Sequence, residues 1–393
     1  MSKLDLPSAR PLSLELAQQV LTPWLAERLK SRDLKITAWR SAGAGNSADT
    51  FFAAVSGDRE GGAGDVRLVI RRQNLGSDIF LESDLELPTR VMAAVAAQPQ
   101  ATGIPVPRVI GLETDASLLG APFMVMEQLP GRILPQSPNY NKEGWLADMP
   151  TADRGRVWRS CLEMLARIHK LPVTGFAFLN RPERGAAPFD QYLHWIEEWY
   201  QWARAGRPHR ITDVAMEYLK ANRPRDAQAS LLWGDPQPTN LLFLPDGTIS
   251  GVIDWEMAVI GPPEADLAWW LFFDDLFSKG MGVPRLEGLP ERAACIRWYE
   301  AALGRPVRNL PYYDILAAFR MAIVGMRSAD RQIQRGRIPE TTTARENAPI
   351  VRLLAGLLGE PLPEVGADFA QLMAALGMEA SLAKASVTKG ETG

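Results

Sequence analysis

Three oxygen-bearing side chains stand at spacings that suit chemistry on a phosphorylated compound. Asp235 and Asn240 lie five positions apart in a proline-rich loop between two apolar, β-like runs. Asp254 follows nineteen positions after Asp235, at the end of a third β-like run. We expect adjacent strand ends to bring the three together, and their carboxylate and amide oxygens suit Mg²⁺ that also binds phosphates. Phosphoryl transfer needs one Asp to orient the acceptor hydroxyl, and an Asn and a second Asp to hold the metal.

Each of these residues alone has a plainer interpretation, because Asp and Asn are common loop formers and turn caps. The combination of all three, with apolar strands on either side, favours a shared site over three unrelated turns.

The elements that must position these residues fall into two parts of different character. Before residue 130, short β-like runs alternate with glycine-rich breaks, which predicts an antiparallel sheet of about five strands with one long helix. After Pro130-Gly131 helical periodicity dominates, interrupted by the β patch that carries the three side chains. We therefore expect an α+β fold of two lobes, 1–129 and 130–393, with a ligand cleft between them. The expected strands include 34–41, 50–55, 66–72, 108–112 and 123–127, and the expected helices include 14–30, 80–97, 188–204, 343–358 and 366–384.

Composition excludes several classes of function. The 393 residues include 43 Lys and Arg against 46 Asp and Glu, whereas a dedicated nucleic-acid binder carries a basic excess. Two cysteines, Cys161 and Cys295, are too few for a disulfide framework, and the three histidines form no HExxH pair. No run approaches about 18 uninterrupted apolar residues, so we expect no membrane span, and the simplest location is the cytoplasm.

The two motifs around the three side chains resemble those of the aminoglycoside phosphotransferase-like family, relatives of the protein kinases and choline kinases. The family's catalytic loop reads His-Gly-Asp, four residues and Asn, and here the chain has Trp233-Gly234-Asp235, four residues and Asn240. The family's metal-binding segment reads Ile-Asp-Trp-Glu and later Asp-Leu-Ala, which matches Ile253-Asp254-Trp255-Glu256 and Asp266-Leu267-Ala268. The resemblance covers nearly the whole chain and implies a bilobal protein-kinase-like fold.

The resemblance implies a role for each residue of the set. Asp235 would be the catalytic base, while Asn240 and Asp254 would ligate Mg²⁺, with ATP as the phosphate donor and GTP as an open alternative. Asp266, at the start of a helix, is expected to cap that helix. Trp233 departs from the family's usual His, and an indole neither accepts a hydrogen bond nor titrates.

A glycine-rich stretch near the N-terminus has two interpretations. The run from Gly43 to Ala48 fits G-x-G-x-x-G/A, the dinucleotide-binding fingerprint, but that fingerprint requires a helix after the glycines. The residues that follow have β character, so we expect a hairpin loop of the kind that covers phosphates in kinases. In that arrangement the backbone at Gly45 and the side chain of Ser47 would contact the nucleotide phosphates.

Kinases also need a cation on the third strand. Arg71 would grip the phosphates there, whereas Arg72 would point to the opposite face of the strand. The family's partner for this cation is a Glu on the following helix. The expected position falls on Pro88, so Glu86 is the nearest candidate.

The segment Pro122–Gly131 resembles the family's hinge between the lobes, although it also reads as an ordinary buried strand. As a hinge, the backbone at Glu127 and Leu129 would hydrogen-bond adenine, with Met126 behind the base.

Two hypotheses from different classes follow. The first is an ATP- and Mg²⁺-dependent phosphotransferase that moves the γ-phosphate to a hydroxyl of a small molecule. The second is a nucleotide-binding pseudokinase with a scaffold role, which Trp233 and the missing helix Glu favour. The intact Asp235, Asn240 and Asp254 set favours the enzyme. A dehydrogenase interpretation of the glycine loop ranks third.

The charge pattern argues against a polycationic acceptor, which would require a carboxylate-rich pocket. Residues 130–230, where this family places much of its acceptor site, hold 15 Arg and Lys against 11 Asp and Glu. Arg320, Arg327, Arg331 and Arg335 share one helix face, which we expect to be a solvated basic face. We therefore expect a neutral or anionic hydroxylated metabolite such as a hydroxy acid, and neither a nucleic acid nor a membrane as partner.

An aromatic stripe leaves two interpretations open. Trp195, Trp199 and Trp202, with Tyr192 one turn before, are spaced along one helix face and are either core or an aromatic wall of the acceptor pocket. His169 is expected at a helix end rather than in catalysis.

Overall fold

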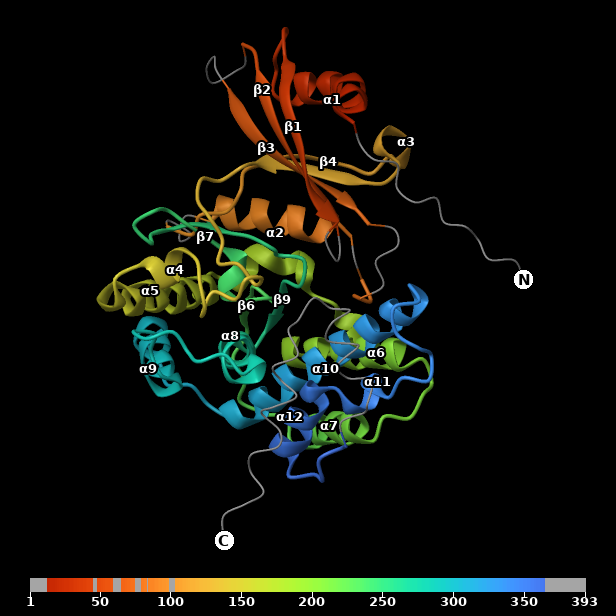
Figure 1. Ribbon diagram of the computed structural model, residues 1–393, viewed down its shortest axis with the longest axis vertical. Helices are drawn as coiled ribbons and strands as arrows, with labels where there is room; N and C mark the ends of the chain where they lie inside the picture. The colour runs from red at the N-terminus through yellow and green to blue at the C-terminus, as the bar shows by residue number, and fades with distance from the viewer. Residues whose placement is uncertain are drawn as a thin grey trace, which may run out of the picture.

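The computed structural model describes residues 13–44, 48–58, 65–74, 79–82, 84–98 and 103–364, which form two lobes along the long axis (Figure 1). The upper lobe in Figure 1 is a five-stranded sheet in the order β1-β2-β3-β5-β4, and every adjacent pair is antiparallel. Its strands are β1 (Lys35–Ala44), β2 (Ala48–Ser56), β3 (Val66–Gln73), β4 (Val109–Glu113) and β5 (Phe123–Glu127), and its helices are α1 (Leu14–Arg28), α2 (Glu86–Ala97) and α3 (Ala116–Leu119).

Alternate residues of β5 explain how the sheet is covered on both faces. Phe123 and Val125 join the apolar cluster around α1, whereas Met124 and Met126 join the cluster that continues into the second lobe. Arg71 on β3 pairs directly with Met124, and paired residues on neighbouring strands point to the same face. The side chain of Arg71 is therefore directed towards the second lobe, as a phosphate-binding cation requires.

The second lobe is mainly helical and is organised around α8. This helix is apolar on nearly all sides and buried along almost its whole length, which is typical of a central core helix. The helices of this lobe are α4 (Trp145–Asp148), α5 (Thr151–His169), α6 (Pro188–Arg204), α7 (Arg210–Ala221), α8 (Pro263–Phe277), α9 (Arg292–Leu303), α10 (Leu310–Gln334), α11 (Ala344–Asn347) and α12 (Pro349–Leu358). Two small antiparallel sheets pair β6 (Ser230–Leu232) with β9 (Val259–Gly261), and β7 (Leu241–Phe243) with β8 (Ile249–Val252).

The predicted fold class is confirmed. Two predicted helices have different bounds in the structure, and a proline accounts for each difference. The helix expected over 80–97 begins only at Glu86, so Pro88 falls in its first turn, where proline is tolerated. The helix expected over 343–358 is interrupted, because Pro349 begins a new helix after α11. The helix expected over 366–384 lies outside the described residues.

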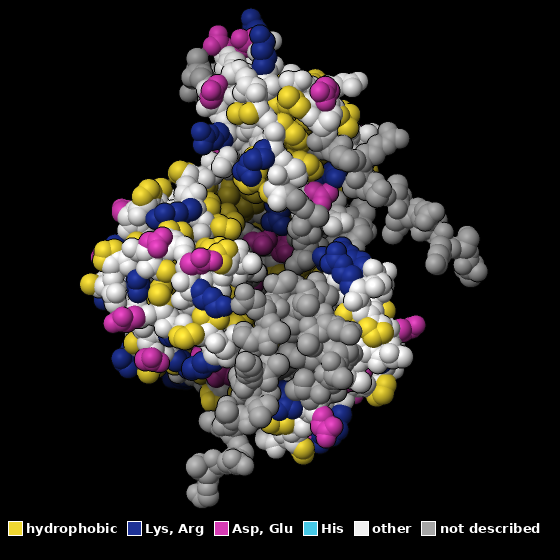
Figure 2. Space-filling model, in the orientation of Figure 1, with side chains coloured by type: hydrophobic (Ala, Val, Ile, Leu, Met, Phe, Trp, Pro, Cys, Tyr) yellow, Lys and Arg dark blue, Asp and Glu magenta, His cyan; other side chains and the backbone are white. Residues whose placement is uncertain are grey.

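Segments that are distant in sequence connect the lobes. The backbone N–H of Val252 donates to the carbonyl of Pro105 at 2.7 Å, and Nε1 of Trp199 donates to the carbonyl of Ile79 at 3.1 Å. Figure 2 shows a hollow between the lobes, with apolar side chains on its wall and charged ones at its base. Within the described ranges, no helix is long and apolar enough to cross a membrane.

Candidate active site

The loop between β6 and β7 carries Asp235 and Asn240, and one glycine fixes its path. Gly234 has a φ of +89°, and a Cβ added there would lie 1.9 Å from the carbonyl oxygen of Met257. No side chain fits such an approach, so position 234 requires glycine. The close crossing holds this loop against the segment that follows Asp254, which brings the two motifs together.

Three hydrogen bonds orient the carboxylate of Asp235. Its Oδ2 atom accepts from Nε2 of Gln237 at 2.7 Å and from Nδ2 of Asn240 at 2.8 Å. Its Oδ1 atom accepts from Nε1 of Trp269 at 2.7 Å. Burial, and then repulsion by the carboxylate of Asp254, raises the pKa of Asp235 against the effect of these donors. The group is a fixed carboxylate with a raised proton affinity, which suits a base that orients a hydroxyl.

Asp254 and Arg71 meet across the two lobes. Asp254 lies just beyond β8 with a φ of +63°, an uncommon backbone conformation for a residue other than glycine. Nη1 of Arg71 donates to Oδ1 of Asp254 at 3.0 Å, and its Nη2 lies 3.5 Å from Oε2 of Glu256. Burial disfavours the charged guanidinium, yet the two carboxylates outweigh it and raise the pKa of Arg71. The ion pair thus joins the third strand to Asp254, a contact that the sequence did not predict.

The donor set suits a metal ion that is shared with phosphates. In the described part of the chain, no group of three or more His, Cys, Asp or Glu side chains could hold a metal by itself. Asn240 directs its amide nitrogen to Asp235, which turns its amide oxygen away, and Asp254 has a second carboxylate oxygen besides the one bonded to Arg71. Two hard oxygen ligands, completed by phosphate and water, are typical of Mg²⁺. The repulsion between Asp235 and Asp254 also favours a divalent cation beside them.

Of the acids left open as the partner of Arg71, the candidate Glu86 does not pair with it. Glu86 is exposed and lies 3.2 Å from Arg90 on the same helix, whereas the acids beside Arg71 come from the metal-binding motif. Arg72 points to the opposite face as predicted, where it is buried and lies 2.7 Å from Asp49. The helix Glu of the family is thus replaced by carboxylates of the second lobe.

Asp266 does not cap its helix, contrary to the prediction. α8 begins at Pro263, and its N-cap makes no side-chain hydrogen bond. The fully buried carboxylate of Asp266 instead accepts from the backbone N–H groups of Trp233 at 2.7 Å and Gly234 at 3.2 Å. It also lies 3.1 Å from Nε2 of His169, which ends α5 as predicted. Asp266 therefore anchors the catalytic loop, and His169 supports that anchor.

The indole at position 233 has a structural role. Trp233 is buried, its Nε1 donates to the carbonyl of Ile253 at 2.9 Å, and its ring centroid lies 6.0 Å from that of Trp255. These contacts tie the catalytic loop to the residue just before Asp254. A side chain that supports a loop in this way needs neither to titrate nor to accept a hydrogen bond. The departure from the family's usual His is therefore compatible with an intact site.

Two of the four arginines expected on a solvated face, both on α10, are not on such a face, so that expectation is wrong for them. Arg320 is 1% exposed, donates to the carbonyl of Gly234 at 2.8 Å and lies 4.1 Å from the ring centroid of Trp269. Arg327 lies 4.1 Å from the ring centroid of Trp202. Periodicity shows that residues share a helix face, but it does not show whether that face is turned inward.

Sequence reasoning missed three residues of this site: Glu256, Trp269 and Arg320. Glu256 had a signal, since it belongs to the Ile-Asp-Trp-Glu motif. Trp269 and Arg320 lie 34 and 86 positions from their partners in the catalytic loop, where no spacing rule applies.

The segment expected to be the hinge includes β5 and the residues after it, where the chain passes from the first lobe to the second. Met126 is buried on the sheet face that looks towards the second lobe. The backbone N–H of Glu127 donates to the carbonyl of Arg108 at 2.9 Å, and Leu129 follows beyond the end of β5. The contacts of Glu127 and Leu129 with adenine stay a prediction.

The strands on either side of the glycine-rich stretch pair as a hairpin, as predicted. β1 and β2 pair up to Ala44 and Asp49, so a strand and not a helix follows the glycines. Gly45 and Ser47 themselves lie outside the described residues. The dinucleotide fingerprint therefore lacks the helix it requires.

A cavity of mixed polarity opens beside the metal-binding motif. The segment after that motif, the start of α2 and helix α6 line it, and its lining residues include Trp195, Arg181 and Arg184. Tyr192 and Trp199 of the aromatic stripe are 1% exposed and belong to the core. The core interpretation therefore holds for Tyr192 and Trp199, whereas Trp195 lines the wall of a cavity.

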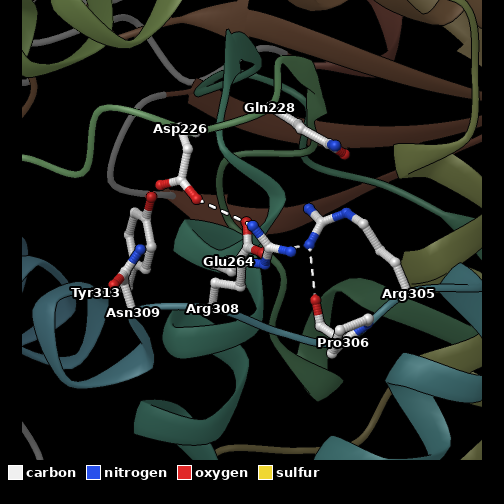
Figure 3. A pocket seen from close by; sticks show the side chains of 9 residues that line it. Asp226, Gln228, Glu264, Arg305, Pro306, Arg308, Asn309 and Tyr313 are labelled. Atoms are coloured by element: carbon white, nitrogen blue, oxygen red, sulfur yellow. Dashed lines mark hydrogen bonds and ion pairs between the residues drawn. The ribbon is translucent and has the colours of Figure 1, made fainter.

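Figure 3 shows a second pocket, at the first turn of α8 and the loop before α10. Its charged side chains form two ion pairs, with Arg305 2.6 Å from Glu264 and Arg308 3.1 Å from Asp226. None of its lining residues belongs to the predicted site. We therefore place the candidate active site at the catalytic loop.

The interlobe cleft, the Asp-Asn-Asp set and the strand cation define a protein of kinase-like architecture. The sequence model of the phosphotransferase enzyme family matches residues 38–306, and the chain belongs to this family. A Ralstonia eutropha protein, provisionally described as an aminoglycoside phosphotransferase, is similar with a TM-score of 0.64 and 21% identity, over 86% of this chain and 96% of that one. A thermostable mutant of aminoglycoside phosphotransferase APH(4)-Ia, in a ternary complex with AMP-PNP and hygromycin B, is similar with a TM-score of 0.52 and 15% identity, over 87% and 99%.

Curated relatives are longer proteins. Acyl-CoA dehydrogenase family member 10 of Mus musculus is 24% identical over 93% of this chain and 32% of its own length. Acyl-CoA dehydrogenase family member 11 of Homo sapiens is 25% identical over 71% of this chain and 34% of its own length. The chain thus spans about a third of the length of these relatives.

Proposed function

We propose that this protein is an ATP- and Mg²⁺-dependent phosphotransferase that moves the γ-phosphate to a hydroxyl of a small molecule. Two hydrogen-bonded pairs carry the proposal: Asp235 with Asn240, and Asp254 with Arg71. The two carboxylates repel each other, so the pairs belong to one site. The intact set supports an active enzyme over a nucleotide-binding pseudokinase, because Trp233 has a structural role and acids other than a helix Glu hold Arg71.

In the proposed reaction, the carboxylate of Asp235 accepts a hydrogen bond from the acceptor hydroxyl and takes its proton as the new O–P bond forms. The bond between the γ-phosphorus and the bridging oxygen breaks, and ADP leaves. Asn240 and Asp254 would hold Mg²⁺, which when bound neutralises charge on the phosphates. Arg71 faces the same point from β3 and supplies charge-assisted hydrogen bonds to phosphate oxygens.

For the acceptor we propose a neutral or anionic hydroxy compound. Three acids line the cavity beside the metal-binding motif, and each is engaged: Glu82 lies 2.5 Å from Arg184, Glu256 lies 3.5 Å from Arg71, and Asp84 accepts from the backbone N–H of Leu87 at 2.8 Å. A polycation would require carboxylates in excess. The cavity also offers the apolar surfaces of its Trp, Leu and Met residues to a carbon chain.

The curated relatives add one form of acceptor to the proposed class. These relatives are named as acyl-CoA dehydrogenase family members, and a hydroxyacyl thioester of coenzyme A is an anionic hydroxylated compound. Such thioesters therefore belong in the acceptor panel beside free hydroxy acids.

Two assays test the proposal. Thermal shifts with ATP, GTP and NAD, each with and without Mg²⁺, should show stabilisation by a nucleoside triphosphate that depends on Mg²⁺. ADP release should then occur with a hydroxy acid, a hydroxyacyl thioester or an alcohol, and not with kanamycin, neomycin or streptomycin. Binding of ATP without ADP release on the whole panel would support the pseudokinase instead. Stabilisation by NAD alone would support the dehydrogenase interpretation.

A further inference from the structure

The catalytic loop has a second support that the predicted motifs do not include. Trp269 on α8 is 3% exposed, and its indole N–H donates to Oδ1 of Asp235 at 2.7 Å. Hydrogen bonds to an ionised acceptor are stronger than those between neutral groups. The indole therefore has a defined partner in the carboxylate proposed as the base.

A buried cation holds this indole in place. Arg320 lies 4.1 Å from the ring centroid of Trp269 and also donates to the carbonyl of Gly234, just before Asp235. Burial of a guanidinium is costly without compensation, and Arg320 has no ion pair within the described ranges. The face of the indole, the loop carbonyl, the sulfur of Met257 and the nearby charge of Asp235 compensate the guanidinium instead. A cation over an aromatic face also draws electron density from the ring, which strengthens the N–H as a donor.

The acceptor sites on the carboxylate of Asp235 show which oxygen is available to a substrate hydroxyl. Each carboxylate oxygen has two acceptor sites. Among the described residues, Gln237 and Asn240 each donate a hydrogen bond to Oδ2 of Asp235, whereas Trp269 alone donates to Oδ1. The second site on Oδ1 is then the place for an acceptor hydroxyl, and the indole N–H fixes its direction.

We propose that Trp269, held by Arg320, is a positioning residue that aims the Oδ1 atom of Asp235 at the acceptor hydroxyl. This inference rests on the proposed function, since it concerns the orientation of the base in that reaction. It predicts that loss of the indole N–H lowers kcat and leaves binding of MgATP and of the acceptor nearly unchanged.

The sharpest test replaces the indole N–H with sulfur and leaves the ring in place. Site-specific incorporation of 3-benzothienylalanine at position 269 should lower kcat about 10- to 100-fold, the effect of one hydrogen bond to a charged group. The Kd for MgATP and the KM for the acceptor should change by less than about twofold. The same replacement at Trp270 is the matched control, because Trp270 is fully buried on the same helix and its N–H meets no acceptor among the described residues.

A spectroscopic test needs no turnover and so separates this inference from the proposed function. The indole N–H resonance of Trp269, identified by its loss in Trp269→Phe, should shift in Asp235→Asn and in Arg320→Met. The thermal unfolding midpoint of each variant shows whether that variant is folded. The positioning role would be overturned if the replacements at positions 269 and 270 gave the same kcat, or if the replacement at 269 weakened MgATP binding as much as it lowered kcat. An indole resonance of Trp269 that does not move in Asp235→Asn would also overturn it. Absence of phosphoryl transfer from the unmodified protein would instead refute the proposed function, and the indole shift would still report the contact.

Discussion

At the scale of single residues, the two acidic members of the site are held in different ways. Neutral donors from two amides and an indole hold Asp235, whereas a guanidinium holds Asp254. A guanidinium compensates the charge of a carboxylate, whereas neutral donors orient a carboxylate and leave its charge available to the proton of a hydroxyl. The partners therefore match the separate tasks proposed for the two carboxylates.

Removal of the Asp254 carboxylate should affect metal-dependent binding selectively. Asp254→Ala should abolish the Mg²⁺-dependent part of the ATP thermal shift, because the proposed metal bridge to the phosphates is lost. Asp246→Ala is a control, since it removes the same charge from the exposed turn between β7 and β8. A full Mg²⁺-dependent shift in Asp254→Ala would show that Asp254 is not a metal ligand.

Removal of the Arg71 guanidinium should separate phosphate from adenosine recognition. Arg71→Ala should weaken ATP binding by about tenfold or more and adenosine binding by less, because charge-assisted pairs with phosphate are lost. Arg67→Ala on the same strand is exposed and removes the same charge. Equal losses for ATP and adenosine, measured by calorimetry, would contradict the role of Arg71.

At the scale of elements, one face of α8 fixes the catalytic loop. Asp266 and Trp269 are three residues apart and therefore lie on the same side of the helix. Asp266 accepts from the loop backbone, and Trp269 donates to the side chain of Asp235. A single buried helix thus sets both the path of the loop and the direction of its carboxylate.

The crossing at Gly234 predicts a severe effect of one methyl group. Gly234→Ala should lower the melting temperature strongly and abolish phosphoryl transfer, because the added Cβ would collide with the carbonyl of Met257. Gly206→Ala is a matched control with a φ of +76° and no atom within 4 Å of the added Cβ. The control should cost only the backbone strain of about 1–2 kcal/mol. Similar melting temperatures for the two variants would show that the crossing is not rigid.

A buried histidine before α7 predicts acid-sensitive stability. Burial, and then the charge of Arg207, lowers the pKa of His209 to about 4. Because this lies below the ordinary value of about 6.5, the folded state binds the proton less readily than the unfolded state. The free energy of unfolding therefore has its full contribution from neutral His209 above about pH 6.5. That contribution is lost as the pH falls towards 4.

His209→Gln should therefore show a shallower fall of melting temperature between about pH 6.5 and 4 than the unmodified protein. The exposed His194 on α6 provides the control variant His194→Gln, which should keep the original slope. An unchanged slope in His209→Gln would contradict the assigned effect of its burial.

At the scale of the whole molecule, the sequence predicted contacts that depend on local order and missed those that depend on distant packing. Asp235 and Asn240 lie in the short loop between β6 and β7, and Asp254 follows β8, the partner strand of β7, so the spacing along the chain was sufficient. The acids beside Arg71 stand more than 180 positions away, and the link from Asp266 to His169 spans 97. Periodicity contains no information on such pairs, so the anchoring role of Asp266 could not be predicted.

The central claim is that this molecule transfers phosphate to a hydroxyl through Asp235. The direct measurement supplies MgATP with a labelled γ-phosphate to the unmodified protein and to Asp235→Asn, with hydroxy acids, hydroxyacyl thioesters and aminoglycosides as acceptors. We expect label on a neutral or anionic hydroxy compound, transfer about 10²–10⁴-fold slower in Asp235→Asn, and MgATP affinity within several-fold of the original. Transfer by Asp235→Asn at nearly the original rate, or no transfer by an unmodified protein that binds MgATP, would contradict the account.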